Sequence, residues 1–278
     1  MKDRSVDSDI KSVLTSHIID HLERVRETVK QQWDNSPIKG VRYFYVDDLL
    51  PADLAKQVAD AFPKNDNLWF QRDSFRERKK TFAKIDTINP LMPAITDAIQ
   101  DEKVVKMVSD ITGMDNLEGD YNLYAGGLSM MGPGDFLNPH IDNSHDGARS
   151  RYRRLNLLYY ISPDWDVQNG GNLELWDDGV SQPHEIHAKF NRLVVMETNK
   201  CSWHSVNKVR VDGHRCCVSN YYFSKGSPTG EEYYHVTSFM GRPEQSVVRA
   251  YSKVDNFLRQ TVSEISKTSR GKAQGRLG

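Results

Sequence analysis

The sequence predicts a mainly β protein with helices before and after the β region. Between about residues 117 and 226, turn signals recur at short intervals and separate short apolar, aromatic-rich runs, a pattern typical of β-sandwiches and barrels. Helical periodicity occupies the chain on both sides of this region. We therefore expect one domain over residues 1–278, made of an N-terminal helical support region (1–116), a β core (117–226) and a C-terminal helix with a flexible tail (227–278).

The flanking elements follow from apolar spacing and from residues that end helices. Apolar side chains at intervals of three and four indicate helices, and Asn35-Ser36-Pro37 and Pro63 would end two of them. Val41 to Val46 has the pattern of a short strand, whereas the highly charged stretch from Lys64 to Lys80 is expected to be a surface loop. The predicted helices cover residues 8–34, 51–62, 90–112 (one helix or a pair) and 244–267.

The composition is that of a nearly neutral chain. It has 37 Lys+Arg and 38 Asp+Glu, which gives a net charge of −1 and argues against strong attraction to nucleic acid or to an anionic membrane. No window approaches the roughly 18 apolar residues that a membrane helix needs, and the charged start lacks the apolar stretch of a signal peptide. Three cysteines are too few for a disulfide framework, so we expect a cytoplasmic protein.

Two histidines and one aspartate form a candidate metal site. His140 and Asp142 are two residues apart in a predicted strand, where side chains at positions i and i+2 point to the same face. The two side chains can therefore bind one metal ion side by side. His204, which follows the apolar run 193–196, is the candidate third ligand. Two histidines and a carboxylate on one face of an octahedron are the ligand set of non-haem Fe(II) oxygenases.

An arginine in a later strand requires an explanation of its own. Alternation over residues 215–223 places Arg215, Cys217, Ser219 and Tyr221 on one face. A lone arginine in a β core is costly unless it is paired. A dicarboxylate cosubstrate would supply the partner, because a guanidinium binds a carboxylate as a planar fork.

Two other classes of protein stay open on these residues alone. The chain has nine histidines, so one His-x-Asp arises easily by chance. A zinc hydrolase or isomerase could also use His140, Asp142 and His204, but it would leave Arg215 unexplained. A non-catalytic β-sandwich binding module would make the order of these residues a coincidence.

The segment from about Tyr124 to Phe223 resembles the Fe(II)- and 2-oxoglutarate-dependent dioxygenases, in particular the prolyl-4-hydroxylase-like branch. The resemblance depends on the order of the motifs at residues 140–143, 154–165, 170–176, 190–196, 203–206 and 215–223. It implies a double-stranded β-helix core, a jelly-roll or cupin-like pair of facing sheets.

By position, the resemblance makes His140, Asp142 and His204 the ligands of Fe(II). 2-Oxoglutarate and O2 would be the cosubstrates, with ascorbate as a stimulant. The implied reaction is hydroxylation of an unactivated C–H bond with release of succinate and CO2. Asp142 favours hydroxylation, because related halogenases have a small residue at that position and so leave room for chloride.

The resemblance also defines a cosubstrate pocket. Arg215 would pair with the distal carboxylate of 2-oxoglutarate, and Tyr160 would hydrogen-bond to the same group. Asn156 shares a strand face with Tyr160 by alternation and is expected to line this pocket. In the oxygen-sensing prolyl hydroxylases a tyrosine that contacts the cosubstrate stands ten residues before the first metal-binding histidine, where this chain has Met130. Either Tyr124, the nearest tyrosine, replaces that contact or the contact is lost.

The motifs leave the substrate open between a prolyl residue of a peptide or protein and a free amino acid or similar small metabolite. A basic cluster follows the metal motif and contains Arg149, Arg151, Arg153 and Arg154. It is either a solvated edge or an anchor for an anionic substrate. The solvated edge is favoured for Arg149 and Arg151, and both alternatives stay open for Arg154, which shares the face of Tyr160 by alternation.

Overall fold

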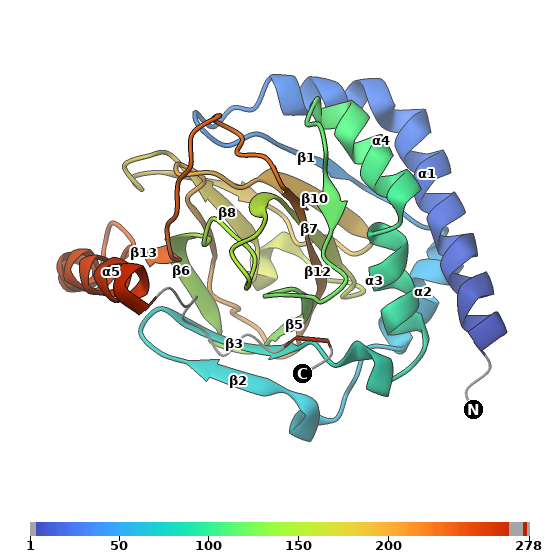
Figure 1. Ribbon diagram of the computed structural model, residues 1–278. Coiled ribbons are helices and arrows are strands. Elements are labelled where there is room, and N and C mark those ends of the chain that lie inside the picture. Colours follow the sequence, from blue (N-terminus) through green and yellow to red (C-terminus); the bar gives the residue numbers. More distant parts are fainter. Residues whose placement is uncertain (1–3, 267–274, 277–278) are drawn as a thin grey trace.

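A strongly curled antiparallel sheet forms the centre of the protein, as the computed structural model shows for residues 4–266 and 275–276 (Figure 1). Neighbouring strands along the sheet are, in order, β1 (Tyr43–Val46), β10 (Arg192–Glu197), β7 (Tyr152–Tyr160), β12 (Arg215–Ser224), β5 (Gly127–Met131), β3 (Glu77–Phe82), β6 (Phe136–Ile141), β11 (His204–Val206), β8 (Leu173–Trp176) and β9 (Pro183–Ile186). Three short strands lie off this path: β13 (Ser238–Phe239) pairs with β6, β2 (Phe70–Asp73) with β3, and β4 (Glu118–Gly119) with β12. The predicted mainly β class with flanking helices is confirmed.

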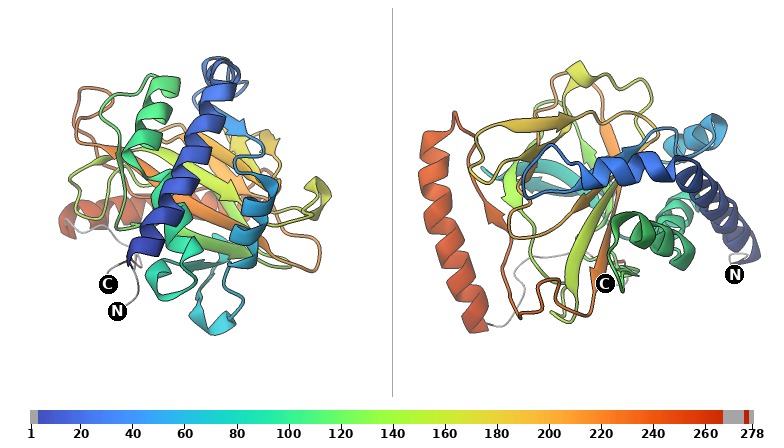
Figure 2. Two further views of the ribbon diagram at one scale, coloured as in Figure 1. Left: turned by 90° about the vertical axis from the view of Figure 1, so that its right-hand side faces the viewer. Right: turned by 90° about the horizontal axis from the view of Figure 1, so that it is seen from above.

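Four helices lie together against one face of the sheet (Figure 2). They are α1 (Arg4–Asp34), α2 (Ala52–Asp60), α3 (Leu91–Ile99) and α4 (Glu102–Thr112). The periodicity of α1 explains its position, because Leu14, Ile18 and Leu22 recur every four residues and are fully buried. Burying each of these side chains contributes roughly 1.5–3 kcal/mol. This layer supports the back of the strands that carry the site.

The predicted helices lie where the sequence placed them, with small shifts at their ends. Residues 90–112 form a pair, α3 and α4, because the Asp101 side chain accepts a hydrogen bond from the Lys103 backbone N–H at 3.1 Å and begins a new helix. Gly113, at φ +66°, ends α4 in the left-handed region. Short 3-10 helices within the described residues are η1 (Asp66–Leu68), η2 (Ile85–Thr87) and η3 (Val167–Asn169).

The charged stretch 64–80 is not the surface loop that the sequence predicts. It contains η1 and most of a hairpin, in which β2 pairs with β3 so that Arg72 stands opposite Lys79. β3 also pairs with both β5 and β6, which makes it part of the main sheet. The prediction was wrong because Glu77 and Lys79 line a polar cavity. No apolar face therefore marks this strand in the sequence.

The last helix, α5 (Ser246–Ser266), lies on the side of the sheet away from the other four (Figure 2). Its polar face contacts the protein: Asn256 exchanges two hydrogen bonds with the Phe239 backbone, and Asp255 pairs with Arg76. The apolar face is exposed, with Val247 at 80 % and Phe257 at 72 %. The predicted amphipathic helix is therefore present, with its polar face turned inward.

No helix in the described part of the chain is both long and apolar enough to cross a membrane. The predicted flexible tail falls mainly on residues 267–274 and 277–278, which lie outside the described residues.

Candidate metal centre and cosubstrate pocket

The two histidines and the aspartate of the candidate metal site lie together inside the curled sheet. β6 and β11 are antiparallel neighbours that place His204 directly opposite His140, and Asp142 follows β6. His140 Nε2 lies 3.6 Å from Asp142 Oδ1, and His204 Nε2 lies 3.8 Å from Asp142 Oδ2. All three side chains are buried, and one ligand atom from each lies within 4.8 Å of the others. This spacing suits the binding of one metal ion by three ligands.

The hydrogen bonds of the imidazoles direct the same ring nitrogen of each toward the centre. His140 Nδ1 lies 3.1 Å from the Asn138 carbonyl oxygen, and His204 Nδ1 lies 2.9 Å from the Ser202 carbonyl oxygen. A ring nitrogen that faces a carbonyl must carry the proton, so the lone pair is on Nε2. Such hydrogen bonds also fix the orientation of metal-binding histidines.

The protonation states of the three side chains suit a divalent cation. Burial and the neighbouring His204 lower the pKa of His140 to about 3, and burial also lowers the pKa of His204. Burial alone would raise the pKa of Asp142, but the charge of Arg153 holds it below its ordinary value. The site therefore holds neutral imidazoles and an ionised carboxylate, the forms that bind a metal.

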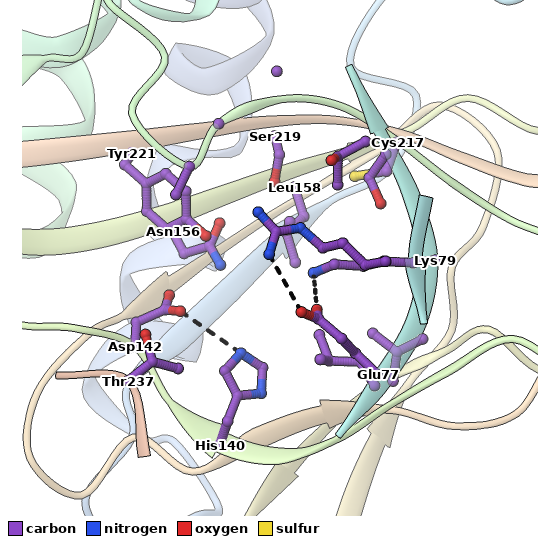
Figure 3. A pocket seen from close by; sticks show the side chains of 18 of the residues that line it. Glu77, Lys79, His140, Asp142, Asn156, Leu158, Cys217, Ser219, Tyr221 and Thr237 are labelled. Atoms are coloured by element: carbon purple, nitrogen blue, oxygen red, sulfur yellow. Dashed lines mark hydrogen bonds and ion pairs between the residues drawn. The ribbon is translucent and has the colours of Figure 1, made fainter. Parts of the chain in front are cut away.

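A cavity of about 260 Å³ opens beside the three side chains (Figure 3). From β12, the cavity is lined by Arg215, Cys217, Ser219 and Tyr221, the face that alternation predicts. From β7 it is lined by Asn156 and Tyr160, as predicted, and by Leu158 between them. The structure thus brings the predicted metal-binding and cosubstrate-binding residues to one cavity.

Several buried polar atoms in this cavity are unsatisfied. Arg215 is only 4 % exposed, and its Nη2 contacts Met131 Sδ at 2.9 Å. Within the described residues, Arg215 Nε, the Tyr160 hydroxyl and Asn156 Oδ1 have no hydrogen-bond partner. Buried polar groups are normally paired, since an unpaired one costs about 1–3 kcal/mol. A carboxylate beside Arg215 and Tyr160 would satisfy two of these groups at once.

The residues at positions 124 and 130 have different surroundings. Tyr124 lines the cavity, whereas Met130 packs in the main hydrophobic core. Met131, the next residue, faces the cavity and carries the sulfur that contacts Arg215. This arrangement is compatible with the alternative in which Tyr124 contacts the cosubstrate in place of the tyrosine that is missing at position 130.

Sequence reasoning missed a charged group from the β2–β3 hairpin. Glu77 pairs with Lys79 at 3.1 Å and with Arg72 at 3.5 Å, and all three side chains line the cavity (Figure 3). Burial opposes the ionisation of Glu77, but the two cations keep its pKa below the ordinary value. The signal in the sequence was the two-residue spacing of Glu77, Lys79 and Thr81, all of which line the cavity.

Of the basic cluster, Arg153 lines the cavity, and not Arg154 as strand alternation indicates. β7 pairs Leu155 with Tyr222 and then Arg153 with Phe223, so a β-bulge at Arg154 reverses the alternation. Arg153 therefore lines the cavity, while Arg154 donates a hydrogen bond to Ser224 Oγ at 3.1 Å.

The other two arginines of this cluster are engaged elsewhere. Arg151 pairs with three carboxylates, Asp146 at 2.9 Å, Asp120 at 3.5 Å and Glu118 at 3.6 Å. The Arg149 guanidinium lies over the Tyr234 ring, 3.9 Å from its centroid. Neither contributes to the cavity lining within the described residues. This excludes them as substrate anchors there, although Arg151 is ion-paired rather than merely solvated.

Comparison with known proteins finds one family model that matches the β core. Residues 126–223, about a third of the chain, match the family model described as the 2OG-Fe(II) oxygenase superfamily. The chain is 33 % identical over 72 residues to prolyl 3-hydroxylase OGFOD1 of Xenopus laevis and 28 % identical over 85 residues to Egl nine homolog 1 of Homo sapiens. These segments cover 24 % and 30 % of this chain but only 14 % and 18 % of the two relatives.

Solved structures show the same fold. A prolyl-4-hydroxylase of Pseudomonas putida superposes with a TM-score of 0.53 at 17 % identity, over 72 % of this chain and 99 % of that one. A prolyl hydroxylase of Trichoplax adhaerens, in complex with a peptide fragment of a hypoxia inducible factor, gives a TM-score of 0.52 at 17 % identity, over 73 % of this chain and 90 % of that one. The predicted jelly-roll core is thereby confirmed.

Proposed function

We propose that this chain, whose β core belongs to the 2OG-Fe(II) oxygenase superfamily, is a dioxygenase that uses Fe(II), 2-oxoglutarate and O2 to hydroxylate an unactivated C–H bond. The observation that carries the proposal is Arg215. It is a buried guanidinium beside three side chains spaced for a metal ion, and within the described part of the chain its Nε has no partner. A dicarboxylate that also binds a metal explains both features together.

The donor set fits Fe(II). His140, Asp142 and His204 offer two neutral imidazoles and one carboxylate, which is the combination found in non-haem Fe(II) oxygenases with open coordination positions. When bound, the iron with 2-oxoglutarate and O2 would supply the oxidising chemistry, with succinate and CO2 as coproducts.

The residues around the metal site would bind and orient the cosubstrate. Arg215 offers a planar pair of N–H donors to the distal carboxylate, and the Tyr160 hydroxyl and Asn156 are unsatisfied groups in the same cavity. Leu158, Met131 and Cys217 add apolar surface to the cavity wall. They would exclude water from the bound cosubstrate and strengthen its charged hydrogen bonds.

For the substrate we propose two alternative kinds, a prolyl residue in a peptide or an amino-acid-like small molecule. Three of the similar proteins are named as prolyl hydroxylases, and one of these was solved with a peptide, which supports the first kind. The near-neutral charge of the chain still argues against nucleic acid as a partner, and the cytoplasmic location stays a prediction from cysteine content.

The zinc-enzyme and binding-module alternatives are less favoured. Neither gives the buried Arg215 a partner, and neither class matches the family of residues 126–223.

Metal analysis and cosubstrate binding test the function. The protein is purified without oxygen, its iron and zinc are measured, and 2-oxoglutarate is added to the Fe(II) form. We expect a metal-to-ligand charge-transfer absorbance that is absent in His204→Ala and unchanged in Arg26→Ala, a control on the surface of α1. Absence of this absorbance in the Fe(II)-loaded parent protein would contradict the proposed function.

A further inference from the structure

Arg153 is a second buried arginine in the cavity whose contacts account for only part of its hydrogen-bonding capacity. Its side chain is 1 % exposed, and Nη1 pairs with Asp142 Oδ2 at 3.1 Å. Its Nε and Nη2 have no hydrogen-bond partner among the described residues. The cost of burying this guanidinium is therefore only partly offset by Asp142.

The two unpartnered nitrogens form one edge of the guanidinium. Nε–H and one N–H of Nη2 point in parallel, the geometry that donates two hydrogen bonds to a carboxylate. The Tyr221 ring packs on one flat face of the group, with its centroid 4.1 Å from the central carbon. The Nε–Nη2 edge is therefore the part of Arg153 whose hydrogen bonds are left for a ligand to make, and the residue lines the cavity.

The charges around the cavity favour an anion. The cationic side chains that line it are Arg72, Lys79, Arg153, Arg215 and Arg259, and the carboxylates that line it are Glu77 and Asp142. Asp142 faces the metal site, and 2-oxoglutarate would bring its own charges to the metal and Arg215. Of the remaining charged side chains, Glu77 forms ion pairs with both Arg72 and Lys79. The cavity keeps an excess of positive charge that suits a negatively charged substrate.

We propose that the substrate carries a carboxylate and that the Nε–Nη2 edge of Arg153 binds it, next to Asp142. This inference rests on the proposed function and names the substrate class for the same site. Since Arg153 is fully buried, the carboxylate must enter the cavity, as the end group of a small acid or as a short acidic side chain of a peptide. A purely structural arginine would need only its contact with Asp142.

The test uses a matched pair of fluorinated probes, trifluoroacetate and trifluoroacetamide, which differ in the carboxylate. The protein is loaded with Mn(II), which shortens the 19F relaxation time of nearby molecules, and saturated with 2-oxoglutarate so that Arg215 is occupied. We expect the relaxation enhancement of trifluoroacetate to exceed that of trifluoroacetamide several-fold. Arg153→Gln should abolish the difference, and Arg153→Lys should keep part of it, because an ammonium keeps the charge and the contact with Asp142 but loses the fork.

Arg154→Gln is the control variant. It removes an arginine from the adjacent position whose side chain bonds to Ser224 instead of lining the cavity. This variant should behave as the parent. Mn(II) binding, measured by electron paramagnetic resonance, shows for each variant that the metal site is intact.

The outcomes separate this inference from the proposed function. If the Fe(II) protein forms the 2-oxoglutarate complex but trifluoroacetate shows no advantage over trifluoroacetamide, the carboxylate site is wrong and the dioxygenase stands. An advantage that survives in Arg153→Gln also refutes the site. If no 2-oxoglutarate complex forms, both proposals are wrong.

Turnover assays identify the source of the carboxylate. Stimulation of 2-oxoglutarate consumption by N-acetyl amino acids, and not by their amides, indicates a small acid. Stimulation by capped peptides with Asp or Glu, and not by their Asn or Gln counterparts, indicates a peptide side chain. Equal stimulation by each acid and its amide contradicts the proposal.

Discussion

Replacing Arg215 should weaken the binding of 2-oxoglutarate while leaving the metal site in place. The guanidinium is 4 % exposed, so its hydrogen bonds to a carboxylate would form away from water. A hydrogen bond to a charged group contributes on the order of 1.5–3 kcal/mol, and every 1.4 kcal/mol corresponds to a factor of about ten in affinity. Arg215→Ala should therefore raise the dissociation constant of 2-oxoglutarate roughly ten- to a hundredfold.

Two milder substitutions give the expected order of effects. Arg215→Lys keeps a charge but loses the planar fork, so its effect should be intermediate. Tyr160→Phe removes one neutral hydrogen bond, which contributes about 0.5–1.5 kcal/mol, and should cost about two- to tenfold. Fe(II) affinity should change much less in all three variants, because neither residue is among the three side chains of the metal site.

The assay is a titration of 2-oxoglutarate into each Fe(II)-loaded variant without oxygen, followed by charge-transfer absorbance. Arg26→Ala, on the surface of α1, is the matched arginine control and should bind as the parent does. Parent-like affinity in Arg215→Ala would refute the assignment of the dicarboxylate pocket, since the distal carboxylate would then be held elsewhere.

Three further predictions concern the metal, the product and pH. His140→Ala and His204→Ala should abolish iron-dependent turnover while far-ultraviolet circular dichroism stays like the parent's; near-normal turnover in either variant would contradict the ligand assignment. Because a carboxylate, Asp142, stands at the proposed third ligand position, the product should be hydroxylated and free of chlorine even at high chloride, and a chlorinated product in mass spectrometry would overturn this. Burial lowers the pKa of His235 to about 4, from an ordinary value of 6.5. The unfolded chain therefore takes up a proton at His235 below pH 6.5 that the folded protein does not, so stability is lost as the pH falls from about 6.5 toward 4. Between pH 7.5 and 5, the parent should lose about 2 kcal/mol more free energy of unfolding in urea than His235→Asn does, and equal losses would refute this.

The parts of the site on regular strands were predictable from the sequence. In β12, Arg215, Cys217, Ser219 and Tyr221 alternate without interruption, and all four line the cavity. His140 and Asp142 come close in sequence, and only the pairing of β6 with β11 was needed to bring His204 to them. Residue order, as in the related family, supplied that long-range pairing, which spacing alone does not contain.

Two features of the cavity could not be predicted because they depend on local departures from the sequence pattern. The β-bulge at Arg154 replaces Arg154 by Arg153 on the cavity face, and nothing in the residue types around it marks the bulge. The hairpin that carries Glu77 and Lys79 lacks an apolar face, because it lines a polar cavity. Both errors therefore concern charged side chains of the cavity wall, where core packing does not determine the residue type.

The central claim is tested most directly by measuring succinate formed from 2-oxoglutarate under O2, with the protein loaded in parallel with Fe(II) and with Zn(II). We predict succinate and CO2 in equal amounts from the Fe(II) form, little from the Zn(II) form and none from Fe(II)-treated His204→Ala. If the Fe(II) form consumes no 2-oxoglutarate, or if the Zn(II) form is equally active, the protein is not a 2-oxoglutarate-dependent dioxygenase.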